Sequence, residues 1–519
     1  MALTTRPHVH ENHRVDGFGC SGVGDFSGRV WRGCFPMVIA VAAMLLTACD
    51  GDVTDTTSAP LTPEVTVSDA ASNPDTTTTT TSLPPLVSMI QVLGGSLPDN
   101  TSTADEVAVT RPDHPEMSYM TAVTVEDSAL IAGGVMYPAN AETTDAAVWT
   151  SPDGMTWDLL EDESGVFGDA VSATGESSDQ VISDVAGGPL GVLAVGSDGL
   201  LFEHDAAVWL SIDGSVWNRM ADDADVLGGE GDQFMHSVIQ TPELAVAVGE
   251  SAGEAAAWVS KDGSLWERAE IHDDSAGTGA EPSTMNDVAV AGYTFVAVGS
   301  AGVDLSPAVW LSADGVTWDR LLDSMAGERS GFSPDESSMS PMAAVAASEH
   351  GLVAIGTKQL HDADPSQTAL TTGGPIVWTS PDGYEWQLIE SSFLKLSDQQ
   401  ETSRYSYLKR GSPVLLEDVA WDGDRVLAIG RYELEPSPND IPSFVTLWTS
   451  ADGGSTWQIA GETTLAPTGS PRGALAFTRS NDSLVLVGTD EAPAGKHPDY
   501  GWMTYAFTPG VWIADLSAG

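Results

Sequence analysis

The sequence predicts an all-β protein: a seven-bladed β-propeller of four-stranded antiparallel blades. Three observations support this prediction. A nine-residue pattern with two tryptophans recurs at spacings of roughly 50 to 70 residues, which indicates a repeat architecture. A pair of apolar runs precedes each copy, and helical periodicity is almost absent from the chain.

The repeated pattern is W-x-S-x-D-G-x-x-W, and each copy reads as strand, turn, strand. Asp-Gly is a strong hairpin signal, because glycine accepts positive φ and aspartate bonds nearby backbone amides. The first Trp ends an apolar run. We expect the second Trp to cover the turn, with its N–H bonded to a carbonyl. The copies are Trp149–Trp157, Trp209–Trp217, Trp258–Trp266, Trp310–Trp318, Trp378–Trp386 and Trp448–Trp457, the last with one extra glycine.

This pattern resembles the Asp-box, S-x-D-x-G-x-x-W, of the sialidase-like (BNR-repeat) β-propellers. Ser450–Trp457 matches that motif in full, and the other five copies lack one residue between Asp and Trp, which predicts tighter turns. The resemblance implies that the boxes are structural and lie on the face opposite the ligand site. It assigns this structural role to Asp153, Trp157, Asp213, Trp217, Asp262, Trp266, Asp314, Trp318, Asp382, Trp386, Asp452 and Trp457.

Seven hairpins of two apolar runs give the blade count, since a hairpin, a Trp strand and a return strand make one four-stranded blade. In most hairpins the second run ends in glycine. The hairpins lie at 121–134, 184–196, 237–249, 287–299, 344–356, 418–430 and 474–488.

The last blade is incomplete, because the chain stops soon after a third strand at Gly510–Ile513. An open blade would leave an exposed edge. We therefore predict that an N-terminal strand, either Leu86–Leu93 or Glu106–Thr110, supplies the fourth strand and closes the ring. Long connections are predicted at 357–376, 390–417 and 489–509.

Residues 1–48 read as a lipoprotein signal peptide. An apolar run at Phe35–Ala48 follows basic residues and is too short to span a bilayer. It ends Leu46-Thr47-Ala48-Cys49, which resembles a bacterial lipobox and implies that Cys49 becomes the lipidated N-terminus of the mature chain. A plain secretory signal with an incidental cysteine is the alternative. The expected location is the outer face of the bacterial cell membrane.

Residues 49–86 are rich in Thr, Pro, Ser and Asp, which predicts a flexible tether to a propeller at 87–519. The other cysteines, Cys20 and Cys34, precede Cys49, so the mature chain has no cysteine pair for a disulfide or a thiolate metal site. Beyond residue 48, 16 Lys and Arg face 72 Asp and Glu, a formal charge of −56. Such a surface repels nucleic acid and attracts cations. We expect a monomer.

Aligning the seven hairpins predicts which residues line the mouth of the central channel. The aligned pairs are Met120-Thr121, Ser183-Asp184, His236-Ser237, Asn286-Asp287, Ala343-Ala344, Glu417-Asp418 and Arg472-Gly473. Carboxylates round a pore could bind Ca²⁺, or a cationic or sugar ligand. The alternative is that each aspartate caps its strand by bonding the neighbouring loop. The candidate ligand-binding residues are Asp184, His236, Asp287, Glu417, Asp418 and Arg472.

By resemblance, sialidase catalysis needs three arginines, a Tyr–Glu pair and an Asp acid/base. Arg219, Arg268 and Arg320 follow the second Trp of a repeat on the outer strand, so we expect them to point away from the site. No spacing joins the remaining candidates into a catalytic set. They are Arg111, Arg329, Arg404, Arg410, Arg431 and Arg472, with Tyr432, Glu433, Glu435 and Tyr500.

We therefore predict a non-catalytic, surface-anchored propeller lipoprotein. It would bind a glycan, peptide or partner protein on its loop face, built by the connections between strands 2 and 3 and between successive blades. A sialidase-type exo-glycoside hydrolase and an assembly-factor-like propeller are the alternatives, and fold alone does not choose among them. His272-Asp273-Asp274 and His361-Asp362-Ala363-Asp364 are weak metal candidates, and Ca²⁺ is the one cofactor suggested.

Overall fold

The computed structural model describes part of the chain. The described residues are 87–93, 117–138, 143–162, 165–168, 178–200, 203–221, 224–272, 281–321, 338–339, 341–361, 370–389, 414–433, 443–462, 473–496 and 503–516. The predictions for the signal peptide, Cys49 and the tether, and those for Arg111, Arg329, Arg404, Arg410, Glu435, Arg472 and Tyr500, lie outside these residues. No helix in the described part of the chain is long and apolar enough to cross a membrane.

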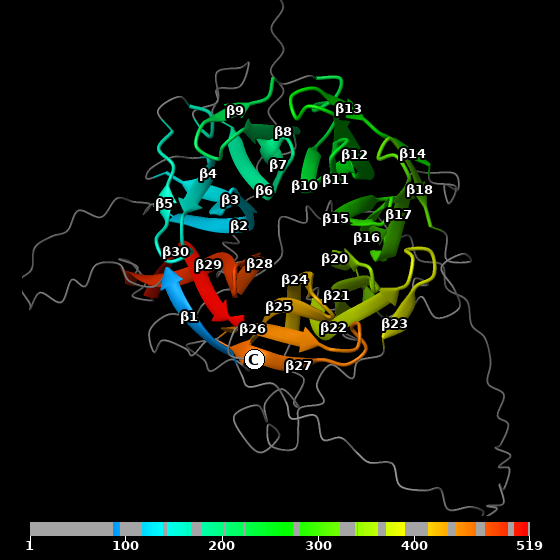
Figure 1. The fold of residues 1–519 in the computed structure, drawn as a ribbon. Coiled ribbons are helices and arrows are strands. Elements are labelled where there is room, and N and C mark those ends of the chain that lie inside the picture. The colour runs from blue at the N-terminus through cyan, green and yellow to red at the C-terminus, as the bar shows by residue number, and fades with distance from the viewer. Residues whose placement is uncertain are drawn as a thin grey trace, which may run out of the picture. The chain divides into compact units, whose positions relative to one another are not determined.

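The described strands form seven small antiparallel sheets arranged as blades round a central channel (Figure 1). The predicted seven-bladed all-β propeller is thus confirmed. From the innermost strand outward, the first four blades are β2 Met117–Glu126, β3 Ala129–Tyr137, β4 Asp145–Ser151 and β5 Asp158–Leu159; β6 Asp179–Gly188, β7 Gly191–Leu200, β8 Glu203–Ser211 and β9 Trp217–Arg219; β10 Gln233–Gln240, β11 Ala245–Ser251, β12 Glu254–Ser260 and β13 Trp266–Arg268; and β15 Ser283–Ala291, β16 Thr294–Ala301, β17 Ser306–Ser312 and β18 Thr317–Arg320.

Blades 5 and 6 follow the same plan, and two short extra strands lie outside it. Blade 5 is β20 Met342–Ser348, β21 Gly351–His361, β22 Leu370–Ser380 and β23 Gln387–Ile389; blade 6 is β24 Val414–Asp422, β25 Arg425–Glu433, β26 Ser443–Ser450 and β27 Gln458–Glu462. β14 Glu270–His272 leaves blade 3 and pairs in parallel with β18 of blade 4. β19 Ser338–Met339 pairs with β21.

Blade 7 is closed by the N-terminal strand, as predicted. Its chain-terminal strands are β28 Gly473–Ser480, β29 Ser483–Lys496 and β30 Met503–Asp515. β1 Val87–Leu93 pairs antiparallel with β30 and, through its first two residues, in parallel with β27 of blade 6. In Figure 1, β1 runs along the outer rim from blade 6 to blade 7. Of the two candidate strands, Leu86–Leu93 is therefore the one that closes the ring.

Two predicted long connections are shorter than expected, because the strands continue past the glycine at the end of the inner hairpin. β21 and β22 stay paired as far as His361 and Leu370. β29 and β30 stay paired as far as Lys496 and Met503. The residues between the paired strand ends are therefore fewer than predicted in both blades.

The hydrophobic cores lie between consecutive blades. The core between blades 2 and 3, for example, joins Val195 and Val208 of blade 2 to Met235 and Trp258 of blade 3. The first Trp of each repeat occupies the equivalent place in its own seam, the interface with the preceding blade. All six of these Trp side chains are at most 4% exposed: Trp149, Trp209, Trp258, Trp310, Trp378 and Trp448.

A β-bulge in every inner strand explains the glycine at the end of each hairpin. In blade 3 the register shifts between Met235 and Ser237, directly opposite Gly249. A Cβ on Gly249 would lie 1.9 Å from the carbonyl oxygen of Phe234, so no larger residue fits there. The same bulge occurs in all seven inner strands.

The repeat turns, the six segments from Ser to the second Trp of each pattern, share one hydrogen-bond plan. In blade 3, Ser260 Oγ accepts from Gly263 N at 2.9 Å, and Asp262 Oδ1 accepts from Ser264 N and Leu265 N, both at 2.8 Å. Trp266 Nε1 donates to the Gly263 carbonyl at 3.1 Å, which is the contact predicted for the second Trp. The same Trp-to-glycine bond occurs in the other five turns.

Each repeat turn also rests on the preceding blade. The turn glycine has positive φ and faces that blade's core, as Gly263 faces Leu193 and Leu210 and Gly315 faces Val246. The repeat turns and the short inner-hairpin turns lie at the same end of the blades, and we call this end the turn face. The loop face is the opposite end.

Candidate functional site

The register shift in each inner strand defines two equivalent positions, the residue at the bulge and the residue directly after it. The bulge residues are Thr121, Ser183, His236, Asn286, Ala343, Glu417 and Leu475, and the following residues are Ala122, Asp184, Ser237, Asp287, Ala344, Asp418 and Ala476. We call these fourteen residues the bulge ring. The predicted alignment holds for blades 2 to 6. It is wrong by one residue in blade 1 and by three in blade 7, where Leu475-Ala476 occupies the position given to Arg472-Gly473.

The three aspartates of the bulge ring tie neighbouring blades together. One carboxylate oxygen of each accepts from the next backbone N–H of its own strand, at 2.7 to 2.8 Å. The other oxygen accepts from a backbone N–H of the following blade: Asp184 from Val238 at 2.8 Å, Asp287 from Val345 at 2.7 Å and Asp418 from Phe477 at 3.1 Å. This geometry is the capping alternative, extended across the 2–3, 4–5 and 6–7 seams.

Burial makes these three carboxyls weaker acids than an exposed aspartate. It raises the pKa of Asp184 to about 7, of Asp287 to about 6 and of Asp418 to about 8. The charge of Asp287 raises the pKa of Asp184 and Asp418 further, so the three groups sense one another round the channel. Backbone N–H groups lower each pKa in part. The hydroxyl of Ser237 also donates to Asp287 at 2.8 Å.

Bulge residues tie two of the remaining seams and add a second tie to the 4–5 seam. Thr121 Oγ1 donates to the Ile182 carbonyl at 2.7 Å, across the 1–2 seam. Asn286 Nδ2 donates to the Met342 carbonyl at 2.7 Å, across the 4–5 seam. His236 Nδ1 lies 3.1 Å from the Met285 carbonyl, across the 3–4 seam. At the 5–6 and 7–1 seams, Ala343, Ala344, Leu475 and Ala476 carry no polar group.

His236 also joins a group of polar side chains at the loop-face end of blades 2 to 4. Burial lowers the pKa of His236, which favours the neutral ring. The Met285 carbonyl can only accept a hydrogen bond, so Nδ1 of His236 carries the proton and Nε2 is left as an acceptor. Thr284 Oγ1 lies 3.4 Å from the same Nδ1. Thr284 also hydrogen-bonds the side chain of Glu250.

We call these side chains, together with the phenylalanine packed among them, the loop-face cluster: His204, Asp232, Phe234, His236, Glu250 and Thr284. Glu250 is its unexpected member. Burial raises the pKa of Glu250 to about 6, and the nearby charge of Asp232 raises it further. Asp232 pairs with His204 at 2.8 Å, and the rings of His204 and His236 lie 5.1 and 6.3 Å from Phe234. Of these residues only His236 was predicted. The one sequence signal was an acid directly after the glycine that ends an apolar run.

The outer-strand arginines are used structurally, in agreement with the expectation that they point away from the channel. Arg219 Nη1 pairs with Asp198 at 2.7 Å and its guanidinium lies 5.0 Å from the Trp209 ring. Arg268 donates to the carbonyls of Val226 and Gly228. Arg431, Tyr432 and Glu433 lie within β25 rather than on a loop.

The described residues contain no group of three His, Cys, Asp or Glu placed to hold a metal ion. His272 lies in β14, where Nε2 faces Glu270 and Nδ1 faces Asp319 of the next blade, both at 3.1 Å. Hydrogen bonds from His272 to Glu270 and Asp319 raise the pKa of His272. Because the two carboxylates lie at opposite ring nitrogens, they cannot bind one metal ion together with the ring. Asp362 and Asp364 lie outside the described residues.

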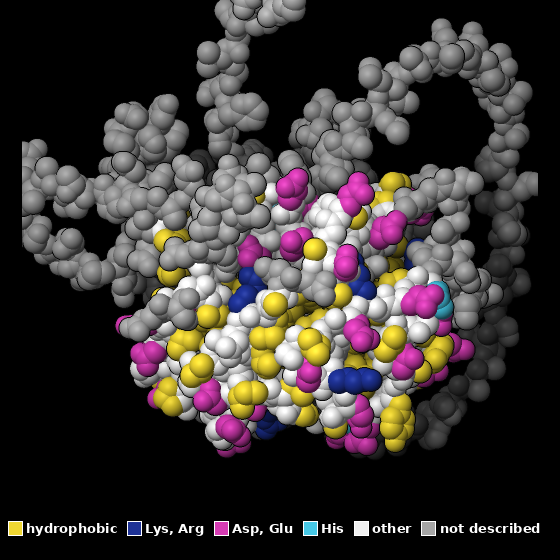
Figure 2. Space-filling model, turned by 90° about the horizontal axis from the view of Figure 1, so that it is seen from above, with side chains coloured by type: hydrophobic (Ala, Val, Ile, Leu, Met, Phe, Trp, Pro, Cys, Tyr) yellow, Lys and Arg dark blue, Asp and Glu magenta, His cyan; other side chains and the backbone are white. Residues whose placement is uncertain are grey.

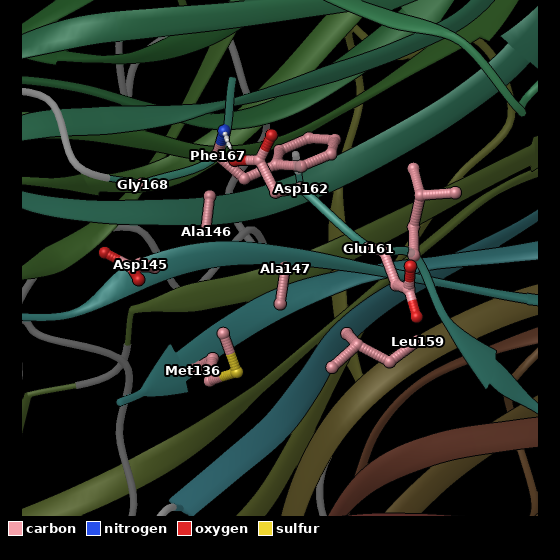
Figure 3. A pocket seen from close by; sticks show the side chains of 10 residues that line it. Met136, Asp145, Ala146, Ala147, Leu159, Glu161, Asp162, Phe167 and Gly168 are labelled. Carbon is pink, nitrogen blue, oxygen red and sulfur yellow. Dashed lines mark hydrogen bonds between the residues drawn. The ribbon is translucent and has the colours of Figure 1, made fainter. Parts of the chain in front are cut away.

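A hollow of about 360 Å³ lies on the outer side of blade 1 (Figure 3). Its wall is largely apolar and includes Met136, Leu159 and Phe167. Asp162 stands beside it, but the Asp162 carboxylate already accepts from Val166 N at 2.9 Å and Phe167 N at 2.6 Å. That acid therefore holds the loop in place rather than facing a ligand.

Comparison with known proteins does not assign a family. No family model and no curated protein matches the chain. Similar solved structures include the α-L-arabinofuranosidase of Fusarium graminearum with arabinobiose (13% identity, TM-score 0.39, 77% of this chain and 94% of that one). A protein of unknown function from Dyadobacter fermentans (11%, 0.38, 77% and 95%) and the phage phi92 endosialidase (11%, 0.40, 77% and 67%) are others. At such identities and TM-scores, similarity assigns no activity to this chain.

Proposed function

We propose that this chain is an exported propeller that binds a ligand on its loop face without transforming it. The loop-face cluster is the observation that carries the proposal. Glu250 is a mostly buried carboxyl with a raised pKa, and keeping it there costs folding free energy. Groups whose pKa is perturbed by burial are candidates for function.

The aspartates of the bulge ring do not compete for this role. They have perturbed pKa values for a structural reason, since each carboxylate is engaged by backbone N–H groups of two blades. Glu250, by contrast, has a hydrogen bond to one threonine side chain, and Nε2 of His236 is an acceptor at the channel mouth. With a pKa of about 6, Glu250 is mostly ionised at neutral pH, so Glu250 and the neutral His236 both offer acceptors, which suits a ligand rich in O–H or N–H donors such as a glycan or a peptide.

The anchoring part of the proposal rests on the lipobox resemblance at Cys49, with residues 49–86 as the tether to the outer face of the cell membrane. Replacing Cys49 with alanine should release the protein from the membrane fraction. Metabolic labelling with a tritiated fatty acid should mark the wild-type protein and leave Cys49→Ala unlabelled. Label on the alanine variant would contradict the assignment.

The ligand-binding part is tested on arrays of immobilised glycans and peptides. The wild-type protein should bind a subset of spots, and Glu250→Gln with His236→Ala should lose that binding while keeping the wild-type circular dichroism spectrum. Aryl glycosides, sialosides included, are assayed in parallel. Turnover that disappears in Glu250→Gln would replace the binding proposal with the glycoside hydrolase alternative.

A further inference from the structure

The turn face carries a repeated set of exposed apolar side chains that the fold does not use. We call Met155, Ile212, Val216, Leu265, Val316 and Tyr384 the turn-face residues. They lie in five successive repeat turns and are between 42 and 74% exposed. Tyr293, in the inner-hairpin turn of blade 4, is 95% exposed at the same end.

The hydrogen bonds of the repeat turns do not require these side chains. In the turn of blade 3, Ser260, Asp262, Gly263 and Trp266 hold the chain, and the Ser264 hydroxyl adds a bond to Asp262 at 3.0 Å. Leu265 contributes only its backbone N–H. Polar residues occupy the same positions in other turns: Ser264 takes the position of Val316, and Thr317 takes the position of Leu265. Single exposed apolar residues are common on proteins. Their recurrence in turn after turn on one face is not explained by the turns.

The same face is strongly acidic. Every repeat turn exposes an aspartate, and backbone hydrogen bonds lower the pKa of Asp153, Asp213, Asp262 and Asp314, so these carboxylates stay ionised. Exposed acids such as Asp127, Glu243 and Asp424 lie in the inner-hairpin turns at the same end. Figure 2 shows the side of the propeller, where acidic side chains are scattered among apolar and uncharged ones and basic ones are few.

We propose that the turn face docks a basic, amphipathic protein segment. The apolar side chains would supply buried contact area, and the ionised aspartates would attract a segment rich in Lys or Arg and steer its approach. The other possible occupants carry the wrong charge. Anionic lipid headgroups are repelled by the aspartates, and a second copy of this chain presents the same negative surface.

The test uses the purified full chain and a fluorescent synthetic peptide with leucine at helical spacing and lysine at the remaining positions. Ile212→Ser, Val216→Ser and Leu265→Ser together should weaken binding by at least about tenfold in a fluorescence anisotropy titration. Val303→Ser is the matched control, because Val303 is 75% exposed but lies in the β16–β17 turn on the loop face. It should leave the affinity unchanged.

Two further arms separate charge from apolar contact and test the other occupants. A peptide with serine in place of leucine should bind the wild-type chain more weakly and should not distinguish it from the triple variant. Equal binding of the leucine peptide to wild type and triple variant would overturn the proposal. These last assays use the full chain with Cys49→Ala, so that no lipid anchor contributes. Co-sedimentation with phosphatidylglycerol vesicles, or self-association, that the triple variant abolishes would overturn the proposal in favour of a lipid surface or a second copy.

Discussion

The bulge ring and the repeat turns use the same residue in opposite electrostatic settings. In both regions an aspartate accepts hydrogen bonds from two backbone N–H groups. In the turns the carboxylate is in water, so those bonds lower its pKa. In the bulge ring burial and mutual repulsion outweigh them, and the pKa rises to about 6 to 8.

This difference shows that a perturbed pKa can come from architecture alone. The aspartates of the bulge ring hydrogen-bond across alternate seams, 2–3, 4–5 and 6–7. Their raised pKa values show that burying these carboxylates in ionised form is unfavourable. The repeat turns join neighbouring blades at the turn face, because the glycine of each turn packs against core side chains of the preceding blade. Blade 7 has no repeat turn, and there β1 spans blades 6 and 7 in its place.

The largest effect is expected from Asp287→Ala. Removing this carboxylate leaves two backbone N–H groups, of Val288 and Val345, and the Ser237 hydroxyl without their acceptor. A buried unsatisfied group costs about 1–3 kcal/mol, so with three such groups the free energy of unfolding in urea should fall by at least about 3 kcal/mol. Asp262→Ala in a repeat turn is the comparison, and an equal loss in both variants would contradict the distinction.

A smaller effect is expected from closing the space between a repeat turn and the blade beneath it. Gly315 has φ of 75°, and a Cβ there would meet Val246 Cγ2 at 2.9 Å. Gly315→Ala should therefore cost about 2–3 kcal/mol, from left-handed backbone strain and overpacking together. Gly292→Ala has a similar φ of 65° but nothing within 4 Å, so it should cost only the strain, about 1 kcal/mol. Thermal unfolding of the two variants measures the difference, and equal losses would show that the turn does not rest on blade 3.

The smallest effect is expected within a turn itself. Asp262→Ala removes the acceptor for Ser264 N and Leu265 N, but water can replace it because the turn is exposed. The free energy of unfolding should fall by about 1 kcal/mol or less, as for the loss of a helix cap. Asp262→Asn, which keeps an acceptor oxygen, should lie closer to wild type in the same urea titration. A larger loss for the asparagine variant would rule out this hydrogen-bonding account.

Most of the fold could be predicted from the sequence because its signals are local. Asp-Gly turns, alternating apolar runs and glycines at strand ends each lie within a few residues, and the missing strand of blade 7 follows from the count. The strand ends at His361 and Lys496 could not be predicted, because pairing continues where the apolar pattern stops. The glycine opposite each bulge is the signal that corrects the alignment of blade 7: Gly488 pairs with Ala474, which places the bulge at Leu475 rather than at Arg472.

The sites were harder to predict because their partners are distant in sequence. The carboxylate of Asp184 is bonded to the backbone of the next blade, and its partner Val238 is 54 residues away in the sequence. Whether such a carboxylate binds a ligand or a backbone amide depends on how two blades meet. Glu250 depends in the same way on Thr284 of the next blade, and the sequence around it reads as an ordinary strand end.

The pH dependence of stability tests the central claim most directly. Asp184, Asp287 and Asp418 have pKa values of about 6 to 8 when folded and roughly 4 when unfolded, so the folded chain holds more protons between these limits. Their contribution to stability is present below pH 4 and is lost as the pH rises to 8. The exposed turn aspartates, with lowered pKa, lose theirs only below pH 4.

We therefore expect the free energy of unfolding of the wild-type protein, measured in urea, to be several kcal/mol lower at pH 8 than at pH 5. Each carboxyl contributes up to about 1.4 kcal/mol per pH unit. In Asp184→Asn/Asp287→Asn/Asp418→Asn most of this fall should disappear, while the repulsion among surface acids stays the same. The same fall in both proteins would contradict the account, because the bulge-ring aspartates would then not be buried acids that tie the blades.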